Sequence, residues 1–267
     1  MSTQIEIPAS SSTDAFIQAF TMILVSEIGD KTFLIAAILA MRHARLTVFA
    51  GAFGSLVVMS ILSAALGHLL PTLIPKRWTQ AAAAVLFFVF AGKMCREGVR
   101  MDGGSSHMEE EMKEAQEEIE EAEAAADPGS IPLASAEAGE FSASAAPVRA
   151  SSWMDGARNL SSLVFGPVFV QAFVLTFLGE WGDRSQIATI ALAAAHNVYL
   201  VTLGTIIGHS ICTAVAVVAG RYVASKVSAK HVTLGGAALF FIFGLFYLYT
   251  ASQPTNVDLI EDHAGSA

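Results

Sequence analysis

The sequence predicts an all-α integral membrane protein with six transmembrane helices, arranged as two inverted three-helix repeats. Hydrophobic residues make up 54% of the 267 residues and charged residues only 15%, whereas soluble proteins carry about 25% charged residues. Six apolar stretches are long enough to cross a bilayer, which takes about 20 residues. The two halves of the chain also repeat one uncommon acidic motif in the same frame. These three observations together define the fold class.

The apolar stretches divide the chain into five parts. We expect transmembrane spans near residues 15–40, 47–70, 79–96, 167–194, 198–222 and 232–251. The resulting segments are a short N-terminus over 1–14, a first repeat over 15–96, an acidic linker over 97–166, a second repeat over 167–251 and a C-terminal tail over 252–267. Because each repeat has an odd number of spans, the second must enter the membrane from the opposite side, as in many secondary transporters.

The two repeats align without a gap at a constant offset of 153 residues. The segment from Phe16 to Phe20 corresponds to the segment from Phe169 to Phe173, and the acidic motifs follow in register. Common apolar composition would not place two rare acidic motifs in the same frame as the flanking aromatic residues. Transporters built from inverted repeats hold their substrate near mid-membrane, at the interface between the repeats. We therefore expect the motifs to meet there.

The distribution of charge predicts the orientation. Eight Lys and Arg residues near helix ends fall on the side of the linker, and only Lys76 and Arg77 fall on the other side. By the positive-inside rule, the linker is cytosolic and both termini face the lumen or the exterior. Nine Glu residues within 109–123 account for most of the net charge of −9, and this segment suits either a solvated helix or a disordered spacer. Without a basic patch, no nucleic-acid partner is expected.

The acidic motif reads Glu27-Ile-Gly-Asp-Lys-Thr32 in the first repeat and Glu180-Trp-Gly-Asp-Arg-Ser185 in the second. Each charge at mid-span costs roughly 2.5–3.5 kcal/mol on the insertion scale, so the charges must be paired inside the protein. In a continuous helix, residues three and four apart share a face, which would direct both carboxylates of each motif the same way. The glycine between them would let an ion or a neighbouring helix approach closely.

We expect four carboxylates to bind a cation and couple its movement to protons: Glu27, Asp30, Glu180 and Asp183. Counted with Lys31 and Arg184, they carry a net charge of −2, which one divalent cation or two protons would neutralise. Carboxylate and hydroxyl oxygens suit Ca²⁺, Mn²⁺ or Mg²⁺. The supporting residues are Lys31, Thr32, Arg184, Ser185, Gly29, Gly182, Gln18 and Gln171, of which the two glutamines either line the cavity or lie outside it. No bound cofactor is expected.

The remaining polar residues carry weaker signals. Cys95 and Cys212 lie in apolar segments, where small core residues are the usual interpretation. His68 and His209 fall in spans without being repeat partners, which is compatible with packed histidines or with proton relays. No His/Cys cluster indicates zinc or copper, and no metal-ligand set such as H-E-x-x-H indicates a hydrolase. We therefore do not expect an enzyme.

Two other functions use the same residues. In a purely structural protein, each motif would form its own ion pair, Glu27 with Lys31 and Glu180 with Arg184, but both aspartates would then remain unpaired. A passive cation channel could also contain these carboxylates. Inverted halves with charges at mid-span suit alternating access better, because the halves can rock about a fixed site.

The doubled motif resembles that of the Gdt family of membrane cation/proton antiporters. The resemblance covers about 16–100 and 166–250, and its signature falls on Glu27, Gly29, Asp30, Lys31 and Thr32, and on Glu180, Gly182, Asp183, Arg184 and Ser185. It implies exchange of Mn²⁺ or Ca²⁺ for protons across an intracellular membrane. The acidic linker and the lack of a transit-peptide pattern are similar to Golgi-type members, with a plastid membrane as the alternative.

Overall fold

A computed structural model describes residues 12–101, 106–126, 166–226 and 228–253, and every regular element within these ranges is a helix. In chain order the helices are α1 (Ser12–Glu27), α2 (Lys31–Arg42), α3 (Arg45–Leu73), α4 (Lys76–Arg100), α5 (Ser106–Ala126), α7 (Pro167–Gly179), α8 (Arg184–Ala195), α9 (Val198–Lys226) and α10 (Ala229–Ser252). The absence of strands in the described part of the chain agrees with the expected all-α class.

Two of the predicted spans are not continuous helices. The span expected over 15–40 is divided into α1 and α2, and the span expected over 167–194 is divided into α7 and α8. Gly29 and Gly182 have φ angles of 84° and 83°, a left-handed conformation that ends a helix readily. The prediction that each motif lies on one helical face is therefore wrong, because both motifs cross a break.

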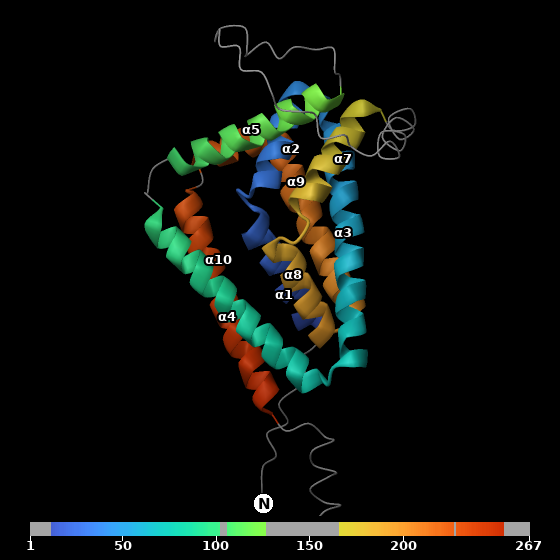
Figure 1. The fold of residues 1–267 in the computed structure, drawn as a ribbon, viewed down its shortest axis with the longest axis vertical. Coiled ribbons are helices and arrows are strands. Elements are labelled where there is room, and N and C mark those ends of the chain that lie inside the picture. Colours follow the sequence, from blue (N-terminus) through green and yellow to red (C-terminus); the bar gives the residue numbers. More distant parts are fainter. Residues whose placement is uncertain (1–11, 102–105, 127–165, 227, 254–267) are drawn as a thin grey trace, which may run out of the picture.

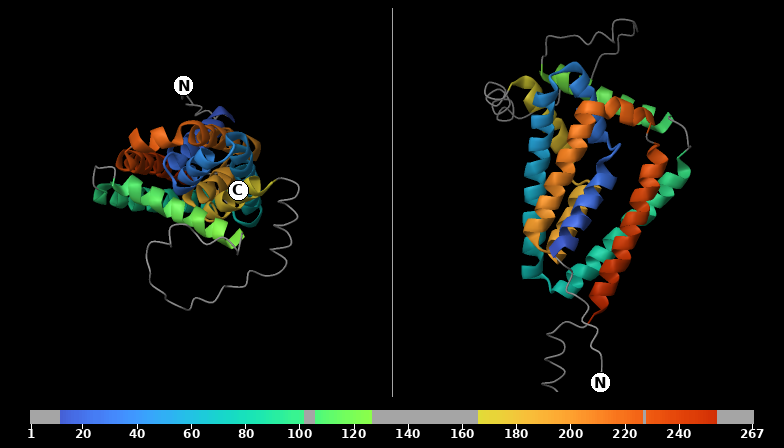
Figure 2. Two further views of the ribbon diagram at one scale, coloured as in Figure 1. Left: turned by 90° about the horizontal axis from the view of Figure 1, so that it is seen from above. Right: turned by 180° about the vertical axis from the view of Figure 1, so that it is seen from behind.

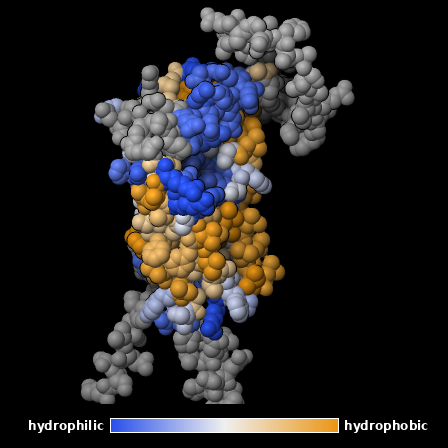
Figure 3. All heavy atoms as spheres, turned by 60° about the vertical axis from the view of Figure 1, so that its left-hand side comes forward, coloured by the Kyte–Doolittle hydropathy of each residue, from blue (hydrophilic) through white to orange (hydrophobic). Residues whose placement is uncertain are grey.

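Four helices of the described chain are long and apolar enough to cross a membrane, and they are α3, most of α4, most of α9 and α10. Large apolar side chains such as Leu62, Val85, Ile211 and Phe241 are exposed on them. Figure 3 shows apolar surface over the lower part of the bundle and polar residues gathered near its upper end. This distribution indicates a protein embedded in a bilayer.

The long helices of each half pack against the broken helices of the other half. α3 contacts α7 and α8, while α9 contacts α1 and α2 (Figures 1 and 2). A Cβ atom at Gly51 would lie 2.5 Å from the Phe169 carbonyl oxygen, and one at Gly204 would lie 2.7 Å from the Phe16 carbonyl oxygen. These two contacts are related by the same 153-residue offset that relates the motifs. The halves therefore interlock through equivalent surfaces.

The two broken helices run in opposite directions, as Figure 1 shows: the chain rises from α1 to α2 and descends from α7 to α8. Helices α4 and α10 form a separate antiparallel pair beside them. The aromatic rings of Phe87 and Phe240 stack in this pair at a centroid distance of 5.8 Å, and Tyr247 packs 5.2 Å from Phe87. The pair contacts the central bundle through α1 and α8.

Helix α5 shows that the acidic part of the linker is helical rather than a disordered spacer. Its buried residues Ala115 and Ile119 pack in one cluster with residues of α2. Its carboxylates also reach basic residues of α2: Glu118 lies 2.7 Å from Lys31, and Glu120 lies 3.6 Å from Arg42. The first part of the linker is therefore docked on the bundle. The rest of the linker, over 127–165, and both terminal segments beyond Ser12 and Gln253 lie outside the described residues.

Candidate cation site

The two helix breaks bring the acidic side chains of both repeats together. Glu27 is the last residue of α1, and Glu180 follows the last residue of α7. Both side chains are buried, with 4% and 1% of their surface exposed. Glu27, Glu180 and Asp183 each place one carboxylate oxygen within 4.8 Å of the others. Such a spacing fits a single hard cation bound between them.

Hydroxyl groups from both repeats hold the Glu180 carboxylate. Thr32, from the first motif, donates a hydrogen bond of 2.6 Å to Oε1, and Ser185 donates one of 3.2 Å to Oε2. In contrast, Oε1 of Glu27 has no hydrogen-bond partner among the described residues, although it is buried. Since a buried unpaired carboxylate oxygen is costly, a proton or a cation at this oxygen of Glu27 would stabilise the site.

The aspartates stabilise the starts of the second half-helices. Asp30 accepts a hydrogen bond from the Thr32 amide at 3.5 Å, and Asp183 accepts one from the Ser185 amide at 3.2 Å. These are N-cap interactions, which satisfy backbone groups that a helix start leaves free. The sequence reasoning missed this role, although an Asp directly after a Gly is a recognisable helix-start signal.

The Arg184 guanidinium joins the two aspartates. Its Nη2 lies 3.4 Å from Oδ1 of Asp30, and its Nε lies 3.7 Å from Oδ1 of Asp183. Asp30 is therefore linked to the site through Arg184 rather than through the three-carboxylate cluster. Each aspartate thus has one oxygen on a helix start and the other beside the guanidinium.

Lys31 lies outside the site that the sequence predicted for it. Its ammonium group pairs with Glu118 of α5, so the proposed pair of Glu27 with Lys31 is wrong. Within the described residues Arg184 pairs with the aspartates and not with Glu180. Neither glutamate forms, among the described residues, the ion pair that the structural interpretation of the motifs assigned to it.

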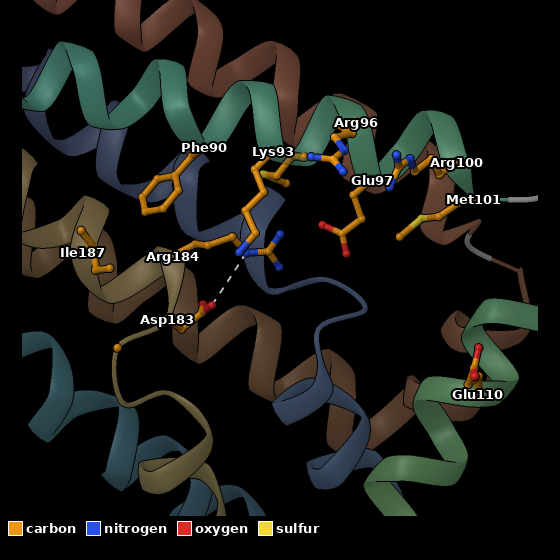
Figure 4. A pocket seen from close by; sticks show the side chains of 12 residues that line it. Phe90, Lys93, Arg96, Glu97, Arg100, Met101, Glu110, Asp183, Arg184 and Ile187 are labelled. Carbon is orange, nitrogen blue, oxygen red and sulfur yellow. Dashed lines mark ion pairs between the residues drawn. The ribbon is translucent and has the colours of Figure 1, made fainter.

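A large cavity leads to this cluster from the end of the bundle where α5 lies. It has a volume of about 950 Å³ and is bounded by the last turns of α4, the start of α5 and the start of α8. Figure 4 shows Lys93 pointing from α4 toward Asp183 and Arg184, with Glu97 on α4 and Glu110 on α5 also lining the cavity. The cavity therefore reaches the cluster on the side of Asp183 and Arg184.

A second, smaller compartment lies against Glu27. Its volume is about 20 Å³, enough for roughly one water molecule. Besides apolar residues it is lined by Thr176, Cys212 and Thr213, and the Thr176 hydroxyl is buried without a partner in the described chain. The sequence analysis did not identify the two threonines, because hydroxyl residues within apolar helices carry no distinctive spacing.

The other candidate residues have different positions. Gln171 donates a hydrogen bond of 3.5 Å to Glu123 of α5, which assigns it to the linker contact rather than to the cluster. Gln18 is half-buried, and its side-chain oxygen has no partner among the described residues. His68 is exposed on α3, whereas His209 is buried in α9.

Comparison with known proteins agrees with this architecture. The family model for the divalent cation/proton antiporter GDT1 matches residues 15–102 and again residues 168–255. The chain is 41% identical to the divalent cation/proton antiporter GDT1 of Saccharomyces cerevisiae, over 93% of this chain and 88% of the yeast protein. It is 40% identical to GDT1-like protein 3 of Arabidopsis thaliana, over 90% of this chain and 72% of that protein.

A third relative, GDT1-like protein 5 of Arabidopsis thaliana, is 38% identical over 88% of this chain and 95% of its own length. No solved structure matches the chain. The matched regions contain both broken helices, both acidic motifs and all four long apolar helices. The family is one of transporters and not an enzyme class. The chain therefore belongs to the GDT1 family of divalent cation/proton antiporters.

Proposed function

We propose that this protein exchanges Mn²⁺ or Ca²⁺ for protons, with Glu27, Asp30, Glu180 and Asp183 as the residues that bind the cation and respond to protons. The observation that carries the proposal is the convergence of Glu27, Glu180 and Asp183, whose carboxylate oxygens lie within 4.8 Å of one another. A cluster of like charges in a buried site is stable only when a cation or protons neutralise it. The two occupants therefore exclude each other, which is the basis of exchange.

The charge at the site supports an electroneutral cycle. With Lys31 paired to Glu118, the site consists of four carboxylates and the Arg184 guanidinium, and a fully ionised site carries three net negative charges. One divalent cation leaves a single charge, which one retained proton neutralises. In the absence of the cation, three protons neutralise the site. The difference between the two states is two protons for each divalent cation.

In the proposed membrane arrangement, α1 with α2 and α7 with α8 each form one span, which gives six spans in two inverted repeats. The opposite directions of the two broken helices support this arrangement (Figure 1). The large cavity at the α5 end would then face the cytosol, where the positive-inside rule places the linker. Alternating access requires that this route closes when the opposite one opens. We place the protein in a Golgi or related secretory-pathway membrane, on the resemblance of its acidic linker to Golgi-type members.

The decisive experiment measures cation flux in sealed proteoliposomes. An imposed pH gradient should drive uptake of Mn²⁺ or Ca²⁺ against its own gradient while the membrane potential is clamped. Glu27→Gln and Glu180→Gln should each abolish this uptake without preventing insertion, because the amide keeps the side-chain volume but cannot exchange a proton. Flux that follows only the cation gradient would indicate a channel. Normal exchange by both variants would contradict the carboxylate mechanism.

A further inference from the structure

The 153-residue offset relates the surroundings of Glu27 to those of Glu180, and the two surroundings differ in polarity. Five apolar residues line the small compartment at Glu27, and they are Phe33, Ala36, Ala52, Leu56 and Ala216. Their counterparts at the offset are, in the same order, Gln186, Thr189, Thr205, His209 and Ser63. Every one of these five apolar positions is thus polar in the other half. The two repeats thus share a backbone arrangement, but the side chains around Glu27 are apolar where their counterparts in the other half are polar.

The polar counterparts are buried where three helices meet. α3, α8 and α9 contact one another pairwise, and Ser63, Thr189 and Thr205 are each 1% exposed. On α3, Met59 receives a hydrogen bond from Gln186 at 2.8 Å, and Gly67 packs against the Ile190 carbonyl group. Ser63 lies about one helical turn from Met59 and from Gly67, so it is level with the turn of α8 that contains Thr189.

Two of these polar groups have no partner within the described protein: the Ser63 hydroxyl and Nδ1 of His209. Burying a polar group without a partner has a free-energy cost, because the group loses its hydrogen bonds to water. Packing does not require this cost, because Ala216 and Leu56 occupy the equivalent positions in the other half. Thr189 and Thr205 each satisfy their hydroxyl on the backbone of their own helix, so the two groups without a partner, on Ser63 and His209, carry the argument. Ionisable side chains inside membrane spans, such as His209, generally face the bundle interior or a water-filled cavity and mark the path of an ion or a proton. A second path is therefore the better explanation.

The position of these polar residues indicates the membrane face from which the path reaches the carboxylates. α8 leads from the second motif to the end of the bundle opposite α5 (Figure 1), whereas the large cavity opens at the α5 end. We propose that Ser63, Thr189, Thr205 and His209 line the passage through which water and the divalent cation reach the carboxylates from the membrane face opposite α5. The inference rests on the proposed alternating access, and the passage is closed in this structure. The apolar counterparts in the other half form a seal.

Cysteine accessibility tests the passage directly. The parent variant is Cys95→Ala, in which the exposed Cys95 is removed and buried Cys212 supplies the baseline. Ser63→Cys and its repeat-equivalent control Ala216→Cys are then treated in sealed vesicles with a membrane-impermeant maleimide, applied to one face at a time. Ser63→Cys should react several-fold faster than Ala216→Cys, and only from the face opposite the linker. Equal rates for the two cysteines, or reaction of Ser63→Cys from the linker face, would overturn the proposal.

A second experiment replaces polar residues of the proposed passage by the apolar residues found at the equivalent positions of the other half. His209→Leu combined with Thr189→Ala introduces the residues that stand at the equivalent positions, Leu56 and Ala36. Proton-driven Mn²⁺ exchange should slow several-fold, while equilibrium Mn²⁺ binding to the purified variant stays unchanged, because the cavity at the α5 end still admits the ion. Unchanged exchange would overturn the passage. If the wild-type protein shows no exchange at all, the proposed function fails instead, and the labelling result still reports the passage.

Discussion

Thr32 of the first motif donates a 2.6 Å hydrogen bond to Glu180 of the second. The bond joins residues separated by 148 positions in the chain, and both side chains are buried. Each motif therefore completes the site of the other, and the two halves cannot separate at this level without leaving a buried carboxylate short of a donor. The threonine is thus a residue of the site rather than only a neighbour of it.

Replacing Thr32 tests this link. Thr32→Val keeps the shape of the side chain but cannot donate, so the deprotonated Glu180 that binds the cation loses a charged hydrogen bond worth about 1.5–3 kcal/mol. The apparent affinity for Mn²⁺ or Ca²⁺ in proteoliposome uptake should fall by roughly tenfold or more. Thr32→Ser is the control and should retain most of the affinity, because it keeps the hydroxyl donor. The bond from Ser185 shows that a serine hydroxyl can donate to this carboxylate.

Arg184 and Lys31 occupy corresponding places in the two motifs, yet they should respond differently to substitution. Arg184→Gln removes the guanidinium group that pairs with both Asp30 and Asp183. We expect loss of exchange together with reduced thermal stability in detergent. Lys31→Gln removes only a half-exposed pair, with side chains 40% and 34% exposed, which is worth about 0–1 kcal/mol. A Lys31→Gln variant as impaired as Arg184→Gln would show that Lys31 belongs to the site after all.

The helix break at Gly182 offers a test of backbone geometry alone. A Cβ atom there meets no atom within 4 Å, but its φ of +83° strains a non-glycine residue by about 1–3 kcal/mol. Gly166→Ala is a matched control, since Gly166 has a φ of +81° and the same free space at the start of α7. Both variants should lose thermal stability. Only Gly182→Ala should also lower the exchange rate, and equal rates would contradict a specific role of the break.

The dependence of cation affinity on pH has a definite sign. In the proposed mechanism the cation binds carboxylates that have released their protons, so protons and the cation compete for Glu27 and Glu180. Apparent affinity should therefore rise as the pH rises through the range in which the site titrates, and level off above it. Release of two protons for each bound cation, measured in a weakly buffered solution on addition of Mn²⁺, would support the proposed stoichiometry. Binding without proton release would contradict it.

The meeting of the two motifs could be predicted from the sequence, because rare charges in apolar segments have few explanations. The structure brings Glu27, Glu180 and Asp183 together as the motifs predicted, and their role in binding a cation stays a prediction. The helix breaks were not predicted, because each apolar segment is long enough to be one continuous span, although the Gly-Asp pair in each motif is a signal for a helix start. The prediction treated each glycine as a point of close approach, whereas the structure uses its left-handed backbone to end a helix.

The partner of Lys31 was also beyond reach of the sequence. Local spacing favoured Glu27, four residues earlier, but the break removes the helical geometry on which that pairing depends. Glu118 lies 87 positions further along the chain and becomes a neighbour only when α5 docks on α2. Pairings of this kind depend on tertiary structure, and a run of nine Glu residues offers no local signal that distinguishes one of them.

The N-caps at Asp30 and Asp183 would link the order of two helix starts to whether an ion is bound. Asp30 and Asp183 cap the starts of α2 and α8 and are also two of the four carboxylates of the proposed ion site. A metal ion that binds either carboxylate would compete with the first backbone amides of that half-helix. We therefore expect amide hydrogen exchange at Thr32 and Ser185 to differ between the loaded and the empty protein.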